Sequence, residues 1–175
     1  MPILQTARLI LRSFQPQDVD LLAELMANPG FMRFSLGVHS REQTAAFLNK
    51  ILLWQDDGLP SLFAVMHSGD DRMIGYCGFY HQQIDQMDEI EIGYRLHPDY
   101  WNRGLITEAA QAVRDHGFRD LKLPRVISLI HPDNIPSRRV AEKNGMTLEK
   151  ETVYRGFRTF VFAITREQWL ENFAS

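Results

Sequence analysis

The sequence has a single cysteine, Cys77, among its 175 residues. It therefore cannot form an intramolecular disulfide, and a reducing compartment is expected. Its apolar runs are far shorter than the roughly 20 residues that a membrane-spanning helix needs. Gln5, Thr6 and Arg8 interrupt the N-terminal segment, where a leader peptide would have its apolar stretch. We therefore expect a cytoplasmic protein that does not contact a membrane.

A basic excess is also missing, because 22 acidic residues outnumber 19 lysines and arginines and give a net charge of −3. Nucleic-acid binders normally carry a basic patch, so no nucleic-acid partner is expected. The six histidines show no zinc-type spacing, and no metal is predicted. The 45% hydrophobic composition is that of an ordinary globular protein, and the length predicts one domain over residues 1–175.

Apolar periodicity and turn residues predict the order β-α-α-β-β-β-α-β-α-β-β. The two N-terminal helices open at Gln15 and at Ser40, where Gln43 completes a capping box. A strand–helix–strand unit after an antiparallel meander predicts an α+β fold with a mixed, mostly antiparallel sheet. Seven strands are expected over 8–13, 62–67, 73–82, 89–96, 125–130, 147–154 and 157–165, and later helices over 107–118, 136–144 and 165–173.

The segment between the strand at 89–96 and the helix at 107–118 predicts an anion site. Gly104 stands where the helix begins, with Arg103 beside it. Helix N-termini present unpaired N–H groups and the positive end of the macrodipole, which together bind phosphate. A single glycine before a helix is more often a simple turn, and the segment lacks the second glycine of a dinucleotide fingerprint and the Gly-Lys-Thr of a P-loop. Both interpretations stay open from this loop alone.

The stretch EIGYRLHPDYWNRGLITEA, which begins at Glu91, resembles motif A of the GNAT acetyltransferase superfamily in its RimJ/RimL-type branch. It departs from the branch pattern EIGYwlhpeyWGkGyatEA at Asn102, where glycine is usual, and at Ile106, where glycine or alanine is usual. A second stretch, DNIPSRRVAEKNGM, is similar to the family pattern N-x-x-S-x-r-v-a-E-K-x-G-F and ends in Met146 instead of phenylalanine. The resemblance extends over about residues 9–165.

This resemblance implies a GNAT fold whose central parallel strands, 89–96 and 125–130, splay apart. It also implies acetyl-CoA as co-substrate, with the pyrophosphate on the loop amides and the pantetheine arm along the backbone near Tyr94–His97. Asn134 would hydrogen-bond that arm. The implied donor-binding residues are Tyr94, Leu96, Trp101, Asn102, Arg103, Gly104, Leu105, Ile106, Thr107, Asn134 and Ser137.

The resemblance further implies direct transfer of the acetyl group to a primary amine in a ternary complex, with Glu91 and Ser137 as catalytic residues. An amine must lose a proton to react, and Glu91 is the candidate base, with Glu89 on the same strand face as second choice. Two solvent-facing strand residues would give the same alternation. Ser137 is expected near the sulfur, more as a contact for the thiolate than as an acid, because a thiol of pKa about 8.5 leaves with little help.

The sequence does not identify the acceptor amine. Segments 31–38 and 154–157 are expected to shape its site, and the acidic set Asp85, Asp88, Glu89 and Glu91 would attract a cationic amine. Some relatives dimerise, so a homodimer stays open. A catalytically silent acyl-CoA-binding domain of the same fold is the alternative function.

Overall fold

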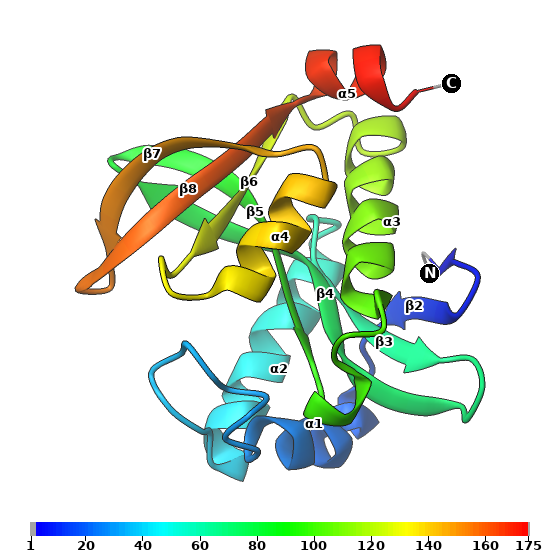
Figure 1. Ribbon diagram of the computed structural model, residues 1–175. Helices are drawn as coiled ribbons and strands as arrows, with labels where there is room; N and C mark the ends of the chain where they lie inside the picture. The colour runs from blue at the N-terminus through cyan, green and yellow to red at the C-terminus, as the bar shows by residue number, and fades with distance from the viewer. Residues whose placement is uncertain (1–2, 175) are drawn as a thin grey trace.

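A single mixed sheet is the centre of the computed structural model, which describes residues 3–174. Its strand order is β1-β2-β3-β4-β5-β6-β8-β7 (Figure 1). Within the described residues, β5 and β6 are parallel and the other neighbours are antiparallel, which confirms the predicted mixed sheet. The strands are β1 Ile3–Gln5, β2 Leu9–Ser13, β3 Leu62–His67, β4 Arg72–Ile84, β5 Met87–Leu96, β6 Arg125–Ile130, β7 Thr147–Tyr154 and β8 Phe157–Thr165.

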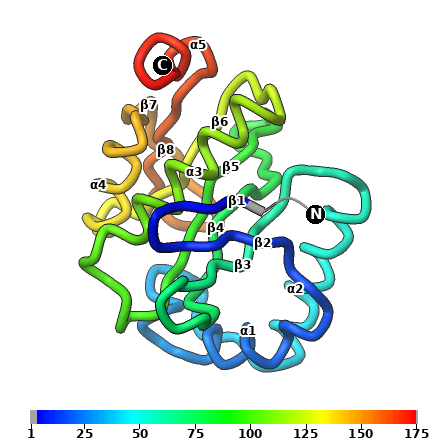
Figure 2. The backbone as a smooth tube through the Cα atoms, turned by 90° about the vertical axis from the view of Figure 1, so that its right-hand side faces the viewer, coloured from blue at the N-terminus to red at the C-terminus, as the bar shows by residue number. Residues whose placement is uncertain are grey.

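The sheet has eight strands, one more than the seven expected. The additional strand β1 pairs with β2 in a hairpin, with Ile3 opposite Arg12, at the edge of the sheet (Figure 2). Three residues are too few to show an alternation of apolar and polar side chains, which is why the pattern missed this strand. The other seven strands overlap the predicted ranges.

Helices cover both faces of the sheet. The capping box predicted at the second helix is confirmed, because the Gln43 amide donates to Ser40 Oγ at 3.1 Å and the Ser40 amide donates to Gln43 Oε1 at 2.8 Å. None of the helices among the described residues combines the length and the apolar character that crossing a membrane demands. The helices are α1 Val19–Met26, α2 Arg41–Asp56, α3 Leu105–Arg119, α4 Ile135–Lys143 and α5 Arg166–Asn172, with short 3₁₀ turns at Pro16–Asp18 and Pro98–Tyr100.

Strand β3 shows how the sheet separates two hydrophobic cores. Phe63 and Val65 belong to the cluster that contains the inner face of α3, whereas Leu62 and Ala64 belong to the cluster that contains α1 and α2. Successive side chains of a strand point to opposite faces, so such an all-apolar run is buried on both sides. Cys77 is likewise buried, as a small apolar residue of the α3 side. These two cores fix the helices on either side of the central strands.

Candidate functional site

Strands β5 and β6 diverge in the middle of the sheet. Their parallel register consists of the pair Glu91 and Ile127, and one step further Ser128 Oγ donates to the Ile92 carbonyl at 2.8 Å. Beyond this point β5 continues to pair with β4 as far as Leu96, while β6 pairs with β8. One edge of β5 therefore faces a gap, and the predicted splay of the parallel pair is confirmed.

The loop that follows β5 contains two residues with left-handed backbone. Asn102 has φ 59°, and Gly104 has φ 74° immediately before α3. Glycine takes this conformation without strain, and asparagine takes it more readily than most residues. The asparagine thus keeps the turn that the family pattern forms with glycine. The first helical bond is donated by the Glu108 amide to the Gly104 carbonyl at 3.1 Å, so the amides of 105–107 precede the hydrogen-bonded ladder.

Glu108 anchors the start of α3 to the turn between β1 and β2. Its carboxylate accepts from the Arg8 amide at 2.9 Å, from Arg8 Nε at 2.8 Å and from the Thr6 hydroxyl at 2.5 Å. Burial alone would raise the pKa of Glu108, but these hydrogen bonds hold it below its usual range. Arg8 also donates to the Arg103 carbonyl at 2.8 Å. The sequence motifs did not indicate this clamp, because Thr6 and Arg8 lie about 100 residues before the loop.

Aromatic residues hold the other half of the loop. Trp101 Nε1 donates to the Leu96 carbonyl at 2.8 Å, and the Tyr100 hydroxyl donates to Asp70 Oδ2 at 2.6 Å. The Arg103 guanidinium lies over the Tyr100 ring, 5.3 Å from its centre. The loop is therefore fixed in shape by contacts of its own side chains before any ligand binds.

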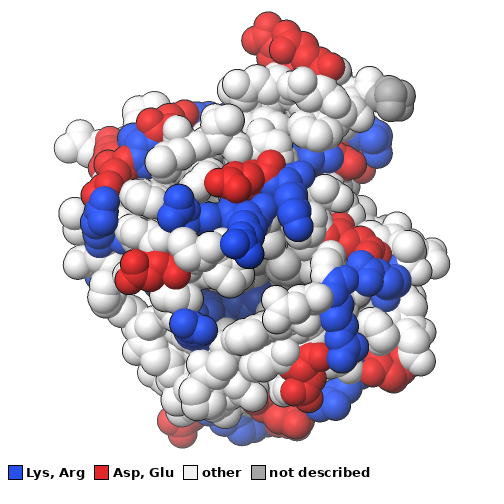
Figure 3. Space-filling model, in the orientation of Figure 1, with Lys and Arg blue, Asp and Glu red and all other residues white. Residues whose placement is uncertain are grey.

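A first cavity of about 390 Å³ lies between this loop, the free edge of β5 and α4 (Figure 3). Of the predicted donor-binding residues, Arg103 and Thr107 do not line it, and the Arg103 guanidinium lies over Tyr100 instead. The predicted residues that do line it are Tyr94, Leu96, Trp101, Asn102, Gly104, Leu105, Ile106, Asn134 and Ser137.

Asn134 and Tyr94 connect α4 to β5 across the gap. Asn134 Oδ1 accepts from the Ser137 amide at 3.3 Å and caps α4. The Tyr94 hydroxyl donates to the Ser137 carbonyl at 3.0 Å, and burial raises the pKa of Tyr94, so this hydroxyl stays neutral. The Tyr94 side chain thus ties β5 to the first turn of α4 at the wall of the first cavity.

A second cavity of about 580 Å³ adjoins the first and shares six wall residues with it: Arg33, Phe34, Tyr94, Arg95, Asn134 and Ser137. Both segments expected at the acceptor site, 31–38 and 154–157, contribute residues to its wall. Phe47 and Trp54 of α2 line it too. Glu91 lines the second cavity and does not line the first.

Two neighbours orient the Glu91 carboxylate. Gln82 Nε2 donates to Glu91 Oε2 at 2.8 Å, and the Tyr154 hydroxyl donates to Gln82 Oε1 at 2.8 Å. Burial raises the pKa of Glu91, and the hydrogen bonds from Gln82 and the Leu129 amide partly oppose that shift. Gln82 and Tyr154 were not predicted to act on Glu91, because they come from β4 and β7.

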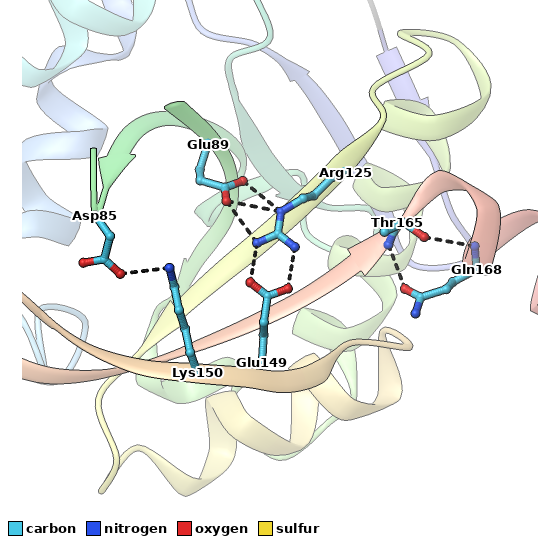
Figure 4. A network of polar contacts seen from close by, with 7 residues as sticks. All are labelled: Asp85, Glu89, Arg125, Glu149, Lys150, Thr165 and Gln168. Atoms are coloured by element: carbon cyan, nitrogen blue, oxygen red, sulfur yellow. Dashed lines mark hydrogen bonds and ion pairs between the residues drawn. The ribbon is translucent and has the colours of Figure 1, made fainter. Parts of the chain in front are cut away.

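Glu89, the second candidate base, is engaged elsewhere. Arg125 bridges it at 3.0 Å and also holds Glu149, while Lys150 pairs with Asp85 at 2.8 Å (Figure 4). These pairs join β5, β6 and β7, and neither Glu89 nor Asp85 lines the second cavity. The expected acidic surface at the acceptor site is therefore wrong, because cationic partners neutralise Asp85 and Glu89, and of the four acidic residues Glu91 alone lines the cavity. No group of three His, Cys, Asp or Glu among residues 3–174 is arranged to hold a metal.

Comparisons with known proteins agree with this geometry. A family model described as "Acetyltransferase (GNAT) domain" matches residues 8–147, which include both motifs and most of the residues around the gap. The chain is 33% identical over 171 residues to the uncharacterized N-acetyltransferase YnaD of Bacillus subtilis (strain 168), covering 94% of this chain and 97% of the relative.

Two solved structures share the fold. The GNAT-family acetyltransferase from Bacillus anthracis superimposes with a TM-score of 0.79 at 31% identity, covering 95% of this chain and 99% of that one. RimL, a ribosomal L7/L12 alpha-N-protein acetyltransferase solved in complex with coenzyme A, gives a TM-score of 0.79 at 24% identity, over 94% of this chain and 98% of its own. With the family model matched over most of its length, this chain belongs to the GNAT family of acetyltransferases.

Proposed function

We propose that this chain is an N-acetyltransferase of the RimJ/RimL-type branch that transfers an acetyl group from acetyl-CoA to a primary amine. The observation that carries the proposal is the meeting of two cavities at Tyr94 and Ser137, beside the splayed strands. One cavity leads to the start of α3 at Gly104, and the other leads to Glu91. Separate approaches for donor and acceptor allow both to be bound together, as direct attack requires.

The first cavity fits the donor. The amides at the start of α3 would hold the pyrophosphate, because a glycine in left-handed conformation leaves them uncovered. Asn134 uses Oδ1 to cap α4, so its Nδ2 is the atom that would donate to the pantetheine arm. Ser137 would lie near the sulfur. The solved complex of RimL with coenzyme A supports this assignment for the branch.

The second cavity fits the acceptor. A primary amine is protonated at neutral pH and must give up a proton before it attacks. Glu91 would take that proton, directly or through water. Its pKa, raised by burial, makes it a stronger base than an exposed carboxylate, and Gln82 fixes its orientation.

Thiol release from acetyl-CoA in the presence of a panel of amines tests this function. We expect release with at least one amine class and saturable binding of coenzyme A by titration calorimetry. Binding of coenzyme A without thiol release from any amine would identify a catalytically silent acyl-CoA-binding domain instead. Absence of coenzyme A binding would overturn both interpretations.

Replacing Gln82 with leucine should shift the acid limb of the pH–rate profile. The lost hydrogen bond stabilises the charged form of Glu91, so the pKa of Glu91 rises further and ionised base appears only at higher pH. We expect kcat/KM to fall about fivefold on the acid limb, as for the loss of one hydrogen bond, and to recover at high pH. Gln83→Leu, one residue along on β4 and outside both cavities, is the control. An unshifted profile in Gln82→Leu would exclude Gln82 as a positioning residue.

A further inference from the structure

The second cavity is positively charged, although the chain as a whole carries a net charge of −3. Glu91 is the one carboxylate among the residues that line it. Four cationic side chains line the same cavity, namely Arg33, Lys50, Arg95 and Arg155, and two of them, Arg33 and Arg95, line the first cavity as well. A concave surface lined by charges of one sign concentrates ligands of the opposite sign.

These four cations are not neutralised by the protein. Arg33 lies over the ring of Phe34, Lys50 over the ring of Trp54 and Arg155 over the ring of Tyr154, with distances of 4.9, 5.0 and 5.1 Å to the ring centres. Arg95 donates to the carbonyls of residues 31 and 33 at 3.0 and 2.8 Å. Within the part of the chain that the structure describes, none of the ion pairs joins any of the four to a carboxylate. Their charge is available to a ligand.

Two of the cations lie near the proposed base. Arg95 stands on the same face of β5 as Glu91, and the charges of Arg155 and Arg95 both act to lower the pKa of Glu91. His39 lies on the same wall, where burial and Arg95 lower its pKa, so it is neutral. Its Nδ1 is buried and has no hydrogen-bond partner among the described residues. The wall around Glu91 thus offers cationic charge from Arg95 and Arg155, while His39 adds none.

The rest of the wall is aromatic. Gly93 leaves room for the Tyr80 ring against the sheet, since a Cβ at this position would lie 2.5 Å from Tyr80 Cε2. Such a wall removes an apolar ligand from water and packs against its flat or branched groups. The aromatic residues that line the cavity are Phe34, Phe47, Trp54, Tyr76, Tyr80, Tyr154 and Phe157.

We infer that the acceptor is a small amine that also carries an anionic group, namely an α-amino acid with an apolar or aromatic side chain. This inference rests on the proposed function of the same site. A polyamine or another polycation would meet four like charges and one carboxylate, which disfavours it. In an α-amino acid the carboxylate meets the arginines while the amine meets Glu91, and the side chain meets the aromatic wall.

The reaction balances with these groups alone. The amine nitrogen forms the new C–N bond as the thioester C–S bond breaks. The protonated amine gives one proton to Glu91 before it attacks, and the second N–H proton, lost as the amide forms, passes to the leaving thiolate to give the thiol of coenzyme A. The products are an N-acetyl amino acid and the free thiol.

A matched series of amines tests the inference on the intact enzyme. The first set contains compounds with the same amine and aromatic side chain: L-phenylalanine, L-phenylalaninamide and phenethylamine. Only L-phenylalanine carries a carboxylate. A second set repeats the comparison with an aliphatic side chain: L-leucine, L-leucinamide and isopentylamine. With rates expressed per neutral amine, we expect kcat/KM at least tenfold higher for the acid than for the amide or the amine in each set. Equal or higher values for the uncharged compounds would overturn the inference.

The variant Arg155→Gln tests whether this arginine recognises the carboxylate of the acceptor. Loss of its charge raises the pKa of Glu91 for every acceptor alike, so we expect kcat/KM for the acid to fall several-fold more than kcat/KM for the amide, and the preference for the acid to shrink. Arg158→Gln is the control, because Arg158 pairs with Glu151 and does not line the cavity. Equal losses for acid and amide in Arg155→Gln would contradict the assignment. Turnover confined to cationic amines or peptide N-termini would overturn the inference and leave the proposed function intact, whereas no turnover with any amine, despite coenzyme A binding, would remove both.

Discussion

Replacement of Glu91 with glutamine is expected to lower kcat/KM for the acceptor about 100-fold at neutral pH, the usual contribution of a positioned general base. The substitution keeps the shape and the hydrogen-bonding partner Gln82 but removes the atom that takes the proton. The loss should be largest between the pKa of Glu91 and that of the acceptor amine. It should narrow above the amine pKa, where the nucleophile is already neutral. The pH–rate profiles of the original protein and of Glu91→Gln, with the acetyl-CoA affinity of each measured in parallel, test this expectation.

Glu89→Gln is the matched control, because it makes the same change two residues away on the same face of β5. Glu89 is paired with Arg125 and lies outside the cavity, so its loss should affect stability and leave kcat/KM near the original value. Equal losses in the two variants would mean that Glu91 acts through the sheet and not on the amine. A full rate in Glu91→Gln would exclude it as the base.

Although Glu91→Gln should lower activity, we expect it to raise the stability of the folded protein near neutral pH. Burial raises the pKa of Glu91 in the folded protein, so ionised Glu91 opposes folding at pH values above that pKa. Glutamine carries no such cost, and Glu91→Gln should unfold at an equal or higher temperature near neutral pH. The difference should vanish in acid, below the pKa of an exposed glutamate, where the carboxyl is protonated in both states. Thermal unfolding at the two pH values measures this directly.

Local patterns were sufficient for most of the fold, because seven strands and the main helices each carry their own periodicity and caps. Strand β1 was not predicted, because three residues are too few to show an apolar–polar alternation and its position depends on pairing with β2. Most of the wall of the first cavity could also be predicted, because its loop and the start of α4 lie within two short contiguous stretches. In that loop, the left-handed φ of Asn102 accounts for the asparagine.

The wall of the second cavity could not be predicted from short contiguous stretches. Its wall takes Lys50 from α2, Gln82 from β4 and Arg155 from the turn after β7, and nothing in the chain order brings these together. Glu89 and Glu91 looked equivalent because they share a strand face. Only the register of β6, which puts Arg125 against Glu89, separates the carboxylate that is held in an ion pair from Glu91, which lines the cavity. The sequence therefore could not predict which distant segments meet at the second cavity.

Replacement of Gly104 with valine should weaken acetyl-CoA binding at least tenfold, which corresponds to about 1.4 kcal/mol. Gly104 has φ 74°, where a β-branched residue is strained by about 1–3 kcal/mol, so the loop is expected to relax away from this conformation. A Cβ there would lie 3.5 Å from Arg8 Nη2, an ordinary contact, so crowding is not the cause. The loss should come from the displaced amides at the start of α3. Gly104→Ala should give a smaller loss, and calorimetric titration with coenzyme A measures both.

Gly58→Val separates this effect from backbone strain in general. Gly58 has φ 70° and no atom within 4 Å of an added Cβ, so valine there meets the same local strain after α2, away from the loop. Both variants should therefore lose stability, but only Gly104→Val should lose donor affinity. If Gly104→Val bound coenzyme A normally, the amides at this helix start would not hold the pyrophosphate. The first cavity would then have to bind coenzyme A through Asn134 and the edge of β5 alone, and the assignment of the start of α3 as the pyrophosphate site would have to be abandoned.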